Sequence, residues 1–182
     1  MKKTIIILTV LALGVFASCD EKQKDPIKKT AAVELAGEWY VRYDGVDADG
    51  KVVAGLEDMN DGNTIALTFN VASDAKDSIW VSDTPEHNLL GFQVKVPCNL
   101  EKLTFGSDNE EVNIYGPSDY IGQMAIIKNG KILKGAAKTP SGMPADSIIF
   151  EVKFPEDAIA AYYSCDHYLA SGFRYTGLAA DE

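Results

Sequence analysis

The chain has 182 residues, 46 % of them apolar, which is typical of one globular domain. It carries 17 basic and 27 acidic residues, a net charge of −10 and a pI near 4.6, so its surface repels phosphate backbones and we expect no nucleic-acid partner. Two histidines and three cysteines leave few ligands for zinc or an iron–sulfur cluster, and we expect neither a metal nor another cofactor.

The first eighteen residues have the pattern of a secretory signal. Lys2 and Lys3 precede an apolar stretch over residues 4–16, and small residues follow it. Thirteen residues in a helix span about 20 Å, short of the roughly 30 Å hydrocarbon core of a membrane. The sequence therefore predicts a signal peptide over residues 1–18 rather than a permanent transmembrane helix.

The end of this signal, Phe16-Ala17-Ser18-Cys19, resembles a bacterial lipobox, although Phe16 stands where Leu or Val is commoner. The resemblance implies cleavage before Cys19 and attachment of a diacylglycerol to its thiol. We therefore expect an outer-membrane lipoprotein held in the membrane by acylated Cys19. Residues 19–34 are predicted to be a flexible tether. The acidic residues after Cys19 resemble a surface-export signal, so a cell-surface position and an ordinary solvated linker both stay open.

Two cysteines remain if Cys19 is acylated. An exported protein can form disulfides, so Cys98 and Cys165 are a candidate pair. The alternative is two separate thiols, one of them a small core residue.

The mature chain is mainly a succession of short strands. A helix is expected over Thr30–Ala36, and from residue 37 onward apolar and polar residues alternate with period two, as in half-buried antiparallel strands. Strands are predicted over residues 39–44, 65–71, 78–82, 90–96, 102–105, 112–115, 122–128, 131–138, 148–154 and 171–177. Asn129-Gly130 predicts a tight type I′ hairpin, and a second helix is expected over Glu156–Tyr163. About ten strands without βαβ alternation predict an antiparallel sandwich or barrel over residues 35–182.

Gly37-Glu38-Trp39 on the first strand and Arg174 on the last resemble the closure motif of lipocalin-like (calycin-type) barrels. The resemblance implies an all-β antiparallel barrel of about 8–10 strands with a short N-terminal and a short C-terminal helix. It also implies that the guanidinium of Arg174 covers the indole of Trp39, a cation–π contact of about 0.5–2 kcal/mol.

A closer resemblance extends over nearly the whole mature chain. It rests on residues 35–41, 129–132, 139–142, 146–150 and 174–177, which are similar to an envelope-lipoprotein family catalogued as lipid-binding putative hydrolase. That family has a lipocalin-like barrel behind a lipobox signal. The resemblance implies the fold and the cellular location more directly than the activity. Both activities in the family name, lipid binding and hydrolysis, are inferences from fold.

Catalysis has no recognisable motif in this sequence. Gly-x-Ser-x-Gly and His-Glu-x-x-His are both missing, and His87 and His167 fit loop residues better than bases. Residues 44–50 have the acidic spacing of a calcium loop but lack its terminal glutamate, so we expect a turn there. We assign no catalytic residues and expect a protein that is not an enzyme, with hydrolysis kept as a weak alternative.

Binding of a small apolar molecule is the leading hypothesis. If the strand register follows Trp39, the inward-facing, candidate ligand-binding residues are Val41, Tyr43, Leu67, Phe69, Phe92, Val94, Phe150 and Val152. These side chains suit an acyl chain or a sterol-like ligand, but they could equally fill the barrel. The runner-up is an accessory protein of an uptake complex that binds glycan or an envelope protein through outer-face aromatics, namely Tyr40, Trp80, Tyr115, Tyr120 and Tyr175.

Overall fold

The computed structural model describes residues 29–69, 75–83, 89–115 and 121–181. The predicted signal peptide, Cys19 and most of the predicted tether lie outside the described residues. The strands are β1 (Gly37–Val46), β2 (Met59–Phe69), β3 (Ser78–Asp83), β4 (Gln93–Asn99), β5 (Thr104–Phe105), β6 (Glu111–Val112), β7 (Met124–Lys138), β8 (Pro144–Lys153) and β9 (His167–Arg174). The helix α2 (Ala158–Tyr163) lies between β8 and β9.

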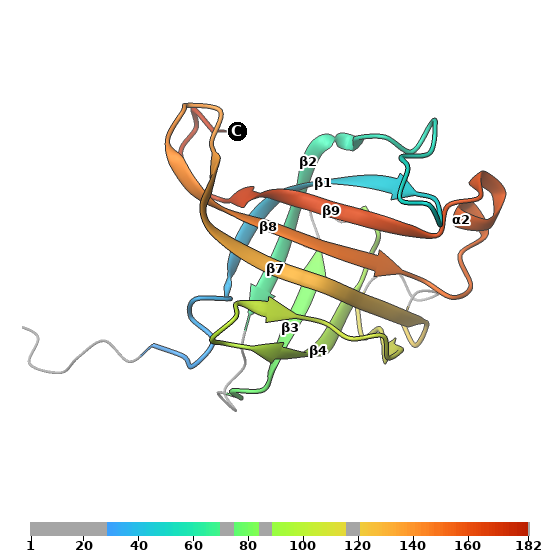
Figure 1. Cartoon of the computed structure of the whole chain (residues 1–182), viewed down its shortest axis with the longest axis horizontal. Helices are drawn as coiled ribbons and strands as arrows, with labels where there is room; N and C mark the ends of the chain where they lie inside the picture. The colour runs from blue at the N-terminus through green and yellow to red at the C-terminus, as the bar shows by residue number, and fades with distance from the viewer. Residues whose placement is uncertain (1–28, 70–74, 84–88, 116–120, 182) are drawn as a thin grey trace, which may run out of the picture.

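The strands form a closed barrel. They are hydrogen-bonded in the order β5-β4-β3-β2-β1-β9-β8-β7, and an additional pairing of β5 with β7 closes the ring of eight. Every pairing is antiparallel, and β6 is a short extra strand against the start of β7. The expected all-β antiparallel barrel is therefore confirmed (Figure 1).

The interior is built from the alternate residues of each strand. Trp39, Val41 and Tyr43 of β1 face inward, as do Phe150 and Val152 of β8, and all five are buried. Successive side chains of a strand point to opposite faces, so the intervening residues cover the outside. One continuous apolar core fills the barrel from end to end.

In strand β2, the residues that face the interior are the alternate set from the one we predicted. Trp39 pairs with Ala66, and Glu38 pairs with Leu67, and directly opposed residues share a face. Leu67 and Phe69 therefore lie on the outer face, and their predicted inward orientation is wrong. The polar Thr68 takes the inner position because its hydroxyl accepts the indole N–H of Trp39 at 2.9 Å. A shift of one residue moves every side chain of a strand to the other face.

The predicted hairpin at Asn129-Gly130 is also not formed. Lys128 pairs with Glu151 and Lys131 with Ile149, so β7 continues through the dipeptide with one extra residue, a β-bulge. Asn129 takes up the bulge with a positive φ of 55°. A Cβ on Gly130 would lie 2.4 Å from the ring of Phe105, so glycine is required where β5 meets β7.

The two expected helices have different outcomes. Thr30–Ala36 forms a turn rather than a helix, in which the amides of Leu35 and Ala36 both donate to the carbonyl of Ala32. The segment is short and passes straight into β1, so no second helical turn can follow. The C-terminal helix is confirmed as α2, whose first turn is capped by the Asp157 carboxylate accepting from two backbone amides.

One end of the barrel is covered by Arg174. Its guanidinium carbon lies 4.2 Å from the ring centroid of Trp39, and Nη1 donates to the carbonyl of Ala36 at 2.9 Å. A Cβ at Gly37 would lie 2.3 Å from that nitrogen, so this position admits only glycine while Arg174 keeps its place. The last strand is thereby fastened to the entry of the first.

Cys98 and Cys165 are separate free thiols, so the second of the two alternatives is the one found. Cys98 lies on β4 opposite Phe105 of β5. Cys165 follows α2, where its thiol donates to the carbonyl of His167 at 3.1 Å. Within the described residues, no helix has the length and apolarity needed to cross a membrane.

Candidate functional site

The two ends of the barrel differ. The Trp39–Arg174 pair covers one end, and the other, which we call the mouth, carries α2 and the first residues of β7 (Figure 1). Six of the predicted ligand-binding residues lie in the interior between these ends, namely Val41, Tyr43, Phe92, Val94, Phe150 and Val152, and at most 1 % of each is exposed. The described side chains thus pack on one another and leave no solvent-reached hollow at these positions.

The mouth holds a cavity of about 420 Å³. It lies where β7 begins and β8 ends, and its lining is Glu110, Gly122, Gln123, Met124, Phe154, Pro155 and Glu156. Met124, Phe154 and Pro155 supply its apolar wall, and both charged residues are acidic. The volume is within the range of small-molecule sites.

Phe154 separates this cavity from the barrel interior. Its ring centroid lies 6.2 Å from that of Phe92 and 6.4 Å from that of Tyr168, both of which are buried. The Tyr168 hydroxyl is satisfied, because it donates to Asp157 Oδ2 at 2.7 Å. Phe154 therefore packs against two other rings, at separations typical of favourable ring pairs.

Tyr43 and Asp83 are polar side chains that are buried in the interior. Tyr43 is fully buried, and its hydroxyl has no hydrogen-bond partner among the described residues. Asp83 is 1 % exposed, and its Oδ2 accepts from the amides of Leu89, Leu90 and Gly91 at 2.8–3.2 Å. Burial raises the pKa of Asp83 to about 6, although hydrogen bonds from the backbone amides of Leu90, Phe92 and Gly91 lower it. Burial, and then the charge of Asp83, also raise the pKa of Tyr43 well above its usual value.

Asp83 was not among the residues that we singled out from the sequence. A signal was present, because Asp83 continues the alternation of Ile79 and Val81, which are both buried. The period-two pattern therefore places a carboxylate on the core face at the end of β3.

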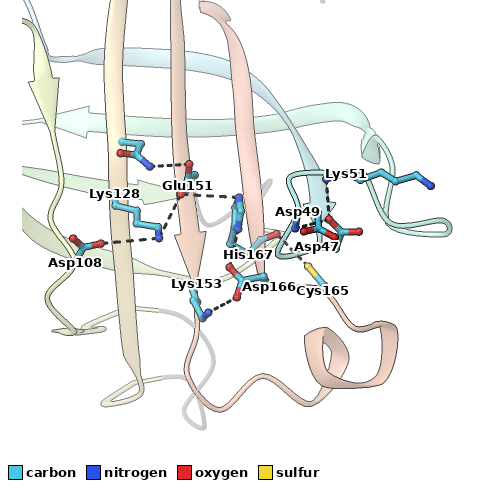
Figure 2. A network of polar contacts seen from close by, with 11 residues as sticks. Asp47, Asp49, Lys51, Asp108, Lys128, Glu151, Lys153, Cys165, Asp166 and His167 are labelled. Carbon is cyan, nitrogen blue, oxygen red and sulfur yellow. Dashed lines mark hydrogen bonds and ion pairs between the residues drawn. The ribbon is translucent and has the colours of Figure 1, made fainter.

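His167 is the described candidate for a catalytic base, and it lies on the outside of the barrel (Figure 2). Its Nδ1 is 3.0 Å from Asp166, and its Nε2 is 4.0 Å from Glu151. The neighbouring Cys165 thiol donates to the backbone carbonyl of His167 and not to its ring. Both ring nitrogens thus face carboxylates, and no hydroxyl or thiol of the described residues bonds to either of them, whereas a hydrolase triad needs a nucleophile there. His87 lies outside the described residues.

The other charges in this region form surface ion pairs. Lys153 lies 2.6 Å from Asp166, and this hydrogen bond is the main cause that lowers the pKa of Asp166 (Figure 2). Asp47 accepts the backbone amides of Asp49 and Lys51, so residues 47–51 form a turn. No cluster of three metal-ligating side chains occurs in the described parts of the chain.

Aromatic side chains gather in one place on the outer face. The ring of Tyr40 lies 5.7 Å from Phe173 and 5.1 Å from Tyr175. Tyr175 also lines a cavity of about 290 Å³ with Asp146 and Arg174. Trp80 lies apart from this group and stacks on Phe69, and Tyr120 lies outside the described residues.

A closed antiparallel barrel of eight strands, covered at one end by an arginine over a tryptophan and with an aromatic cavity at the other, defines a small β-barrel protein of the lipocalin-like class. The chain belongs to the lipid-binding putative hydrolase family, which it matches over residues 24–179. No curated protein matches the sequence.

Proposed function

We propose that this protein is an outer-membrane lipoprotein, anchored through Cys19, that binds a small lipid-like molecule at the mouth of its barrel. The observation that carries the binding proposal is the 420 Å³ cavity walled by Met124, Phe154 and Pro155. Family membership supports a lipid as the ligand. Because the interior is filled, we infer that the ligand binds first at the mouth, with the inward-facing residues below it.

Exposed apolar side chains flank this cavity on both sides. Ile121 is 55 % exposed and adjoins Gly122 of the cavity lining, and Val112 of β6 is 53 % exposed. On the other side, Ile159 and Tyr162 of α2 follow closely after Glu156 of the lining. Apolar groups that surround a pocket mark a surface that contacts an apolar ligand.

A fluorescent apolar probe tests this proposal. The chain carrying Cys19→Ser, which keeps the protein free of acyl groups, is titrated into N-phenyl-1-naphthylamine, whose emission rises in apolar surroundings. Met124→Glu buries a charge in the cavity wall and is expected to weaken binding by about tenfold or more. Leu133→Glu, at a half-exposed position of the same strand, serves as the matched control and is expected to leave binding unchanged. An absence of binding in the parent chain, or equal loss in both variants, would contradict the proposal.

The anchor is tested separately in cells. Incorporation of an alkyne-tagged palmitate is expected in the natural chain and not after Cys19→Ser, and the natural chain is expected to fractionate with the outer membrane. Two or more acyl chains hold a protein firmly in a bilayer, so the variant is expected in the soluble fraction. Protease added to intact cells then distinguishes the cell-surface position from the periplasmic one.

A second candidate function is favoured by the outer-face rings of Tyr40, Phe173 and Tyr175. They lie beside a cavity that contains Asp146 and Arg174, and aromatic rings with nearby polar groups suit a glycan or a protein partner. Retardation of the protein in gels that contain envelope polysaccharides tests this role. Tyr175→Ala is expected to abolish the retardation, and Met124→Glu is expected to leave it unchanged.

A further inference from the structure

The hydroxyl of Tyr43 is an unsatisfied donor at the centre of an apolar barrel. It is fully buried and has no hydrogen-bond partner among the described residues, whereas the hydroxyl of Tyr168, also buried, donates to Asp157. A buried donor without an acceptor costs about 1–3 kcal/mol. Such a cost calls for an explanation, and a ligand that supplies the missing acceptor is one.

Asp83 sets the charge of this part of the interior. Its Oδ2 accepts hydrogen bonds from three backbone amides, and Oδ1 accepts a long hydrogen bond of 3.4 Å from the amide of Phe92. A second anion brought into this low-dielectric region would be repelled strongly. Burial is the main cause that raises the pKa of Tyr43, and the charge of Asp83 raises it further.

The charged residues at the entrance to this part of the interior are negative, as Asp83 is. Both charged residues that line the mouth cavity, Glu110 and Glu156, are acidic. The cavity ends at Phe154, whose ring contacts Phe92, and the amide and carbonyl of Phe92 bond to Asp83. Phe154 and Phe92 therefore lie between the cavity and Asp83, and a ligand head that reaches Asp83 and Tyr43 requires these two rings to move.

We propose that the ligand is a neutral lipid, with an apolar chain in the mouth cavity and an uncharged oxygen-bearing head that accepts a hydrogen bond from Tyr43, and that Asp83 excludes lipids with an anionic head. This inference rests on the proposed lipid binding and specifies which class of lipid is bound. A carbonyl or hydroxyl oxygen supplies the acceptor that Tyr43 lacks. An ionised carboxylate would lie against Asp83 without a compensating cation.

The test compares three ligands with the same eighteen-carbon chain at pH 8: monooleoylglycerol, oleate and oleylamine. Each displaces N-phenyl-1-naphthylamine from the Cys19→Ser chain, below its own aggregation concentration. Monooleoylglycerol is expected to bind at least about tenfold more tightly than oleate. Tyr43→Phe is expected to weaken the binding of monooleoylglycerol by about tenfold, because one hydrogen bond is lost. The binding of the probe itself is expected to stay unchanged. Asp83→Asn is expected to bring oleate close to monooleoylglycerol.

Tyr168→Phe is the matched control, because it removes a buried hydroxyl that already has a partner. It is expected to lower stability but to leave the order of the three ligands unchanged. Equal binding of oleate and monooleoylglycerol, tighter binding of oleylamine, or an unchanged ratio in Tyr43→Phe would overturn this inference while lipid binding stands. A parent chain that does not bind the probe would instead remove the proposed function itself. Urea unfolding of each variant shows whether a loss of binding reflects a loss of fold.

Discussion

Gly130 and Phe105 are in contact across the join that closes the barrel, and a Cβ on Gly130 would lie 2.4 Å from two carbons of the Phe105 ring. The two residues are paired between β7 and β5, and Phe105 is buried in the core. The glycine is therefore needed for space at a position whose φ is not positive.

Gly130→Ala is expected to lower the free energy of unfolding by about 1–3 kcal/mol, the usual cost of overpacking a core. Urea denaturation measures it. Gly122→Ala is the comparison, because Gly122 has a φ of 90° and open space around it, so only a backbone cost of about 1–2 kcal/mol is expected there. Gly130→Ala is also expected to shift the amide resonances of Phe105 and Lys131, because it disturbs the pairing of β5 with β7. Unshifted resonances would show that our account of this glycine is wrong.

Arg174→Lys is expected to destabilise the protein by about 1–3 kcal/mol. The change removes a planar cation that covers Trp39 and also donates to the Ala36 carbonyl, and a lysine cannot replace both contacts. Arg42→Lys is the control, since Arg42 forms a half-exposed ion pair with Asp44 that contributes less than about 1 kcal/mol. Equal destabilisation by the two changes would show that the closing contact has no special energetic role.

Stability is expected to fall as the pH rises from about 4 to about 6. Burial raises the pKa of Asp83 to about 6 in the folded protein, while an unfolded aspartate titrates near 4. Between these values the folded state holds a proton that the unfolded state has lost, so Asp83 destabilises the fold progressively, by up to about 3 kcal/mol, and contributes no further slope above pH 6.

Urea midpoints at pH 4.5, 5.5, 6.5 and 7.5 measure this slope, and Asp83→Asn is expected to abolish it. Asp44, Asp146 and Asp166 have lowered pKa values, so their contribution is lost only as the pH falls below about 4, outside this window. A Carbon-13 titration of the Asp83 carboxyl gives the pKa directly. A midpoint near 4 would contradict the prediction.

The Cys19→Ser chain is expected to contain two free thiols without any reductant. Burial raises the pKa of both Cys98 and Cys165, so maleimide labelling of the folded protein is expected to be slower than that of free cysteine. In denaturant both thiols should label fully, and the mass increase counts them. A protein that labels only after reduction would contain the bridge that the structure lacks.

The strands and their closure follow from local patterns. The alternation around Trp39 in β1 and around Phe150 in β8 predicts both strands and their inner faces, because both segments place most of their large apolar residues on one side. The covered end follows from the resemblance of Gly37, Trp39 and Arg174 to a known motif. These features depend on short segments whose residues all indicate the same structure.

Where prediction failed, a distant partner decided the outcome. In β2 the hydroxyl of Thr68 bonds to the Trp39 indole, which turns Leu67 and Phe69 outward against the hydrophobic pattern. At Asn129-Gly130 the local turn signal is overridden by pairing with β8 on one side and Phe105 on the other. The mouth cavity joins residues from three separate segments and has no signature in any one of them.

The ring of eight strands is completed by β5, which has only two residues. It is paired with β7 at Thr104 and Phe105 alone, whereas β8 follows β7 over most of its length. The bonds on either side of this pairing run from Ser107 to the carbonyl of Ile127 and from Ile132 to that of Leu103. Since local opening needs few bonds to break here, amide hydrogens at this join should exchange with deuterated solvent well before those between β1, β9 and β8. The barrel is thus a well-bonded curved sheet that is closed by one short strand pairing, between β5 and β7. We expect the fluctuations of the molecule to concentrate at this pairing.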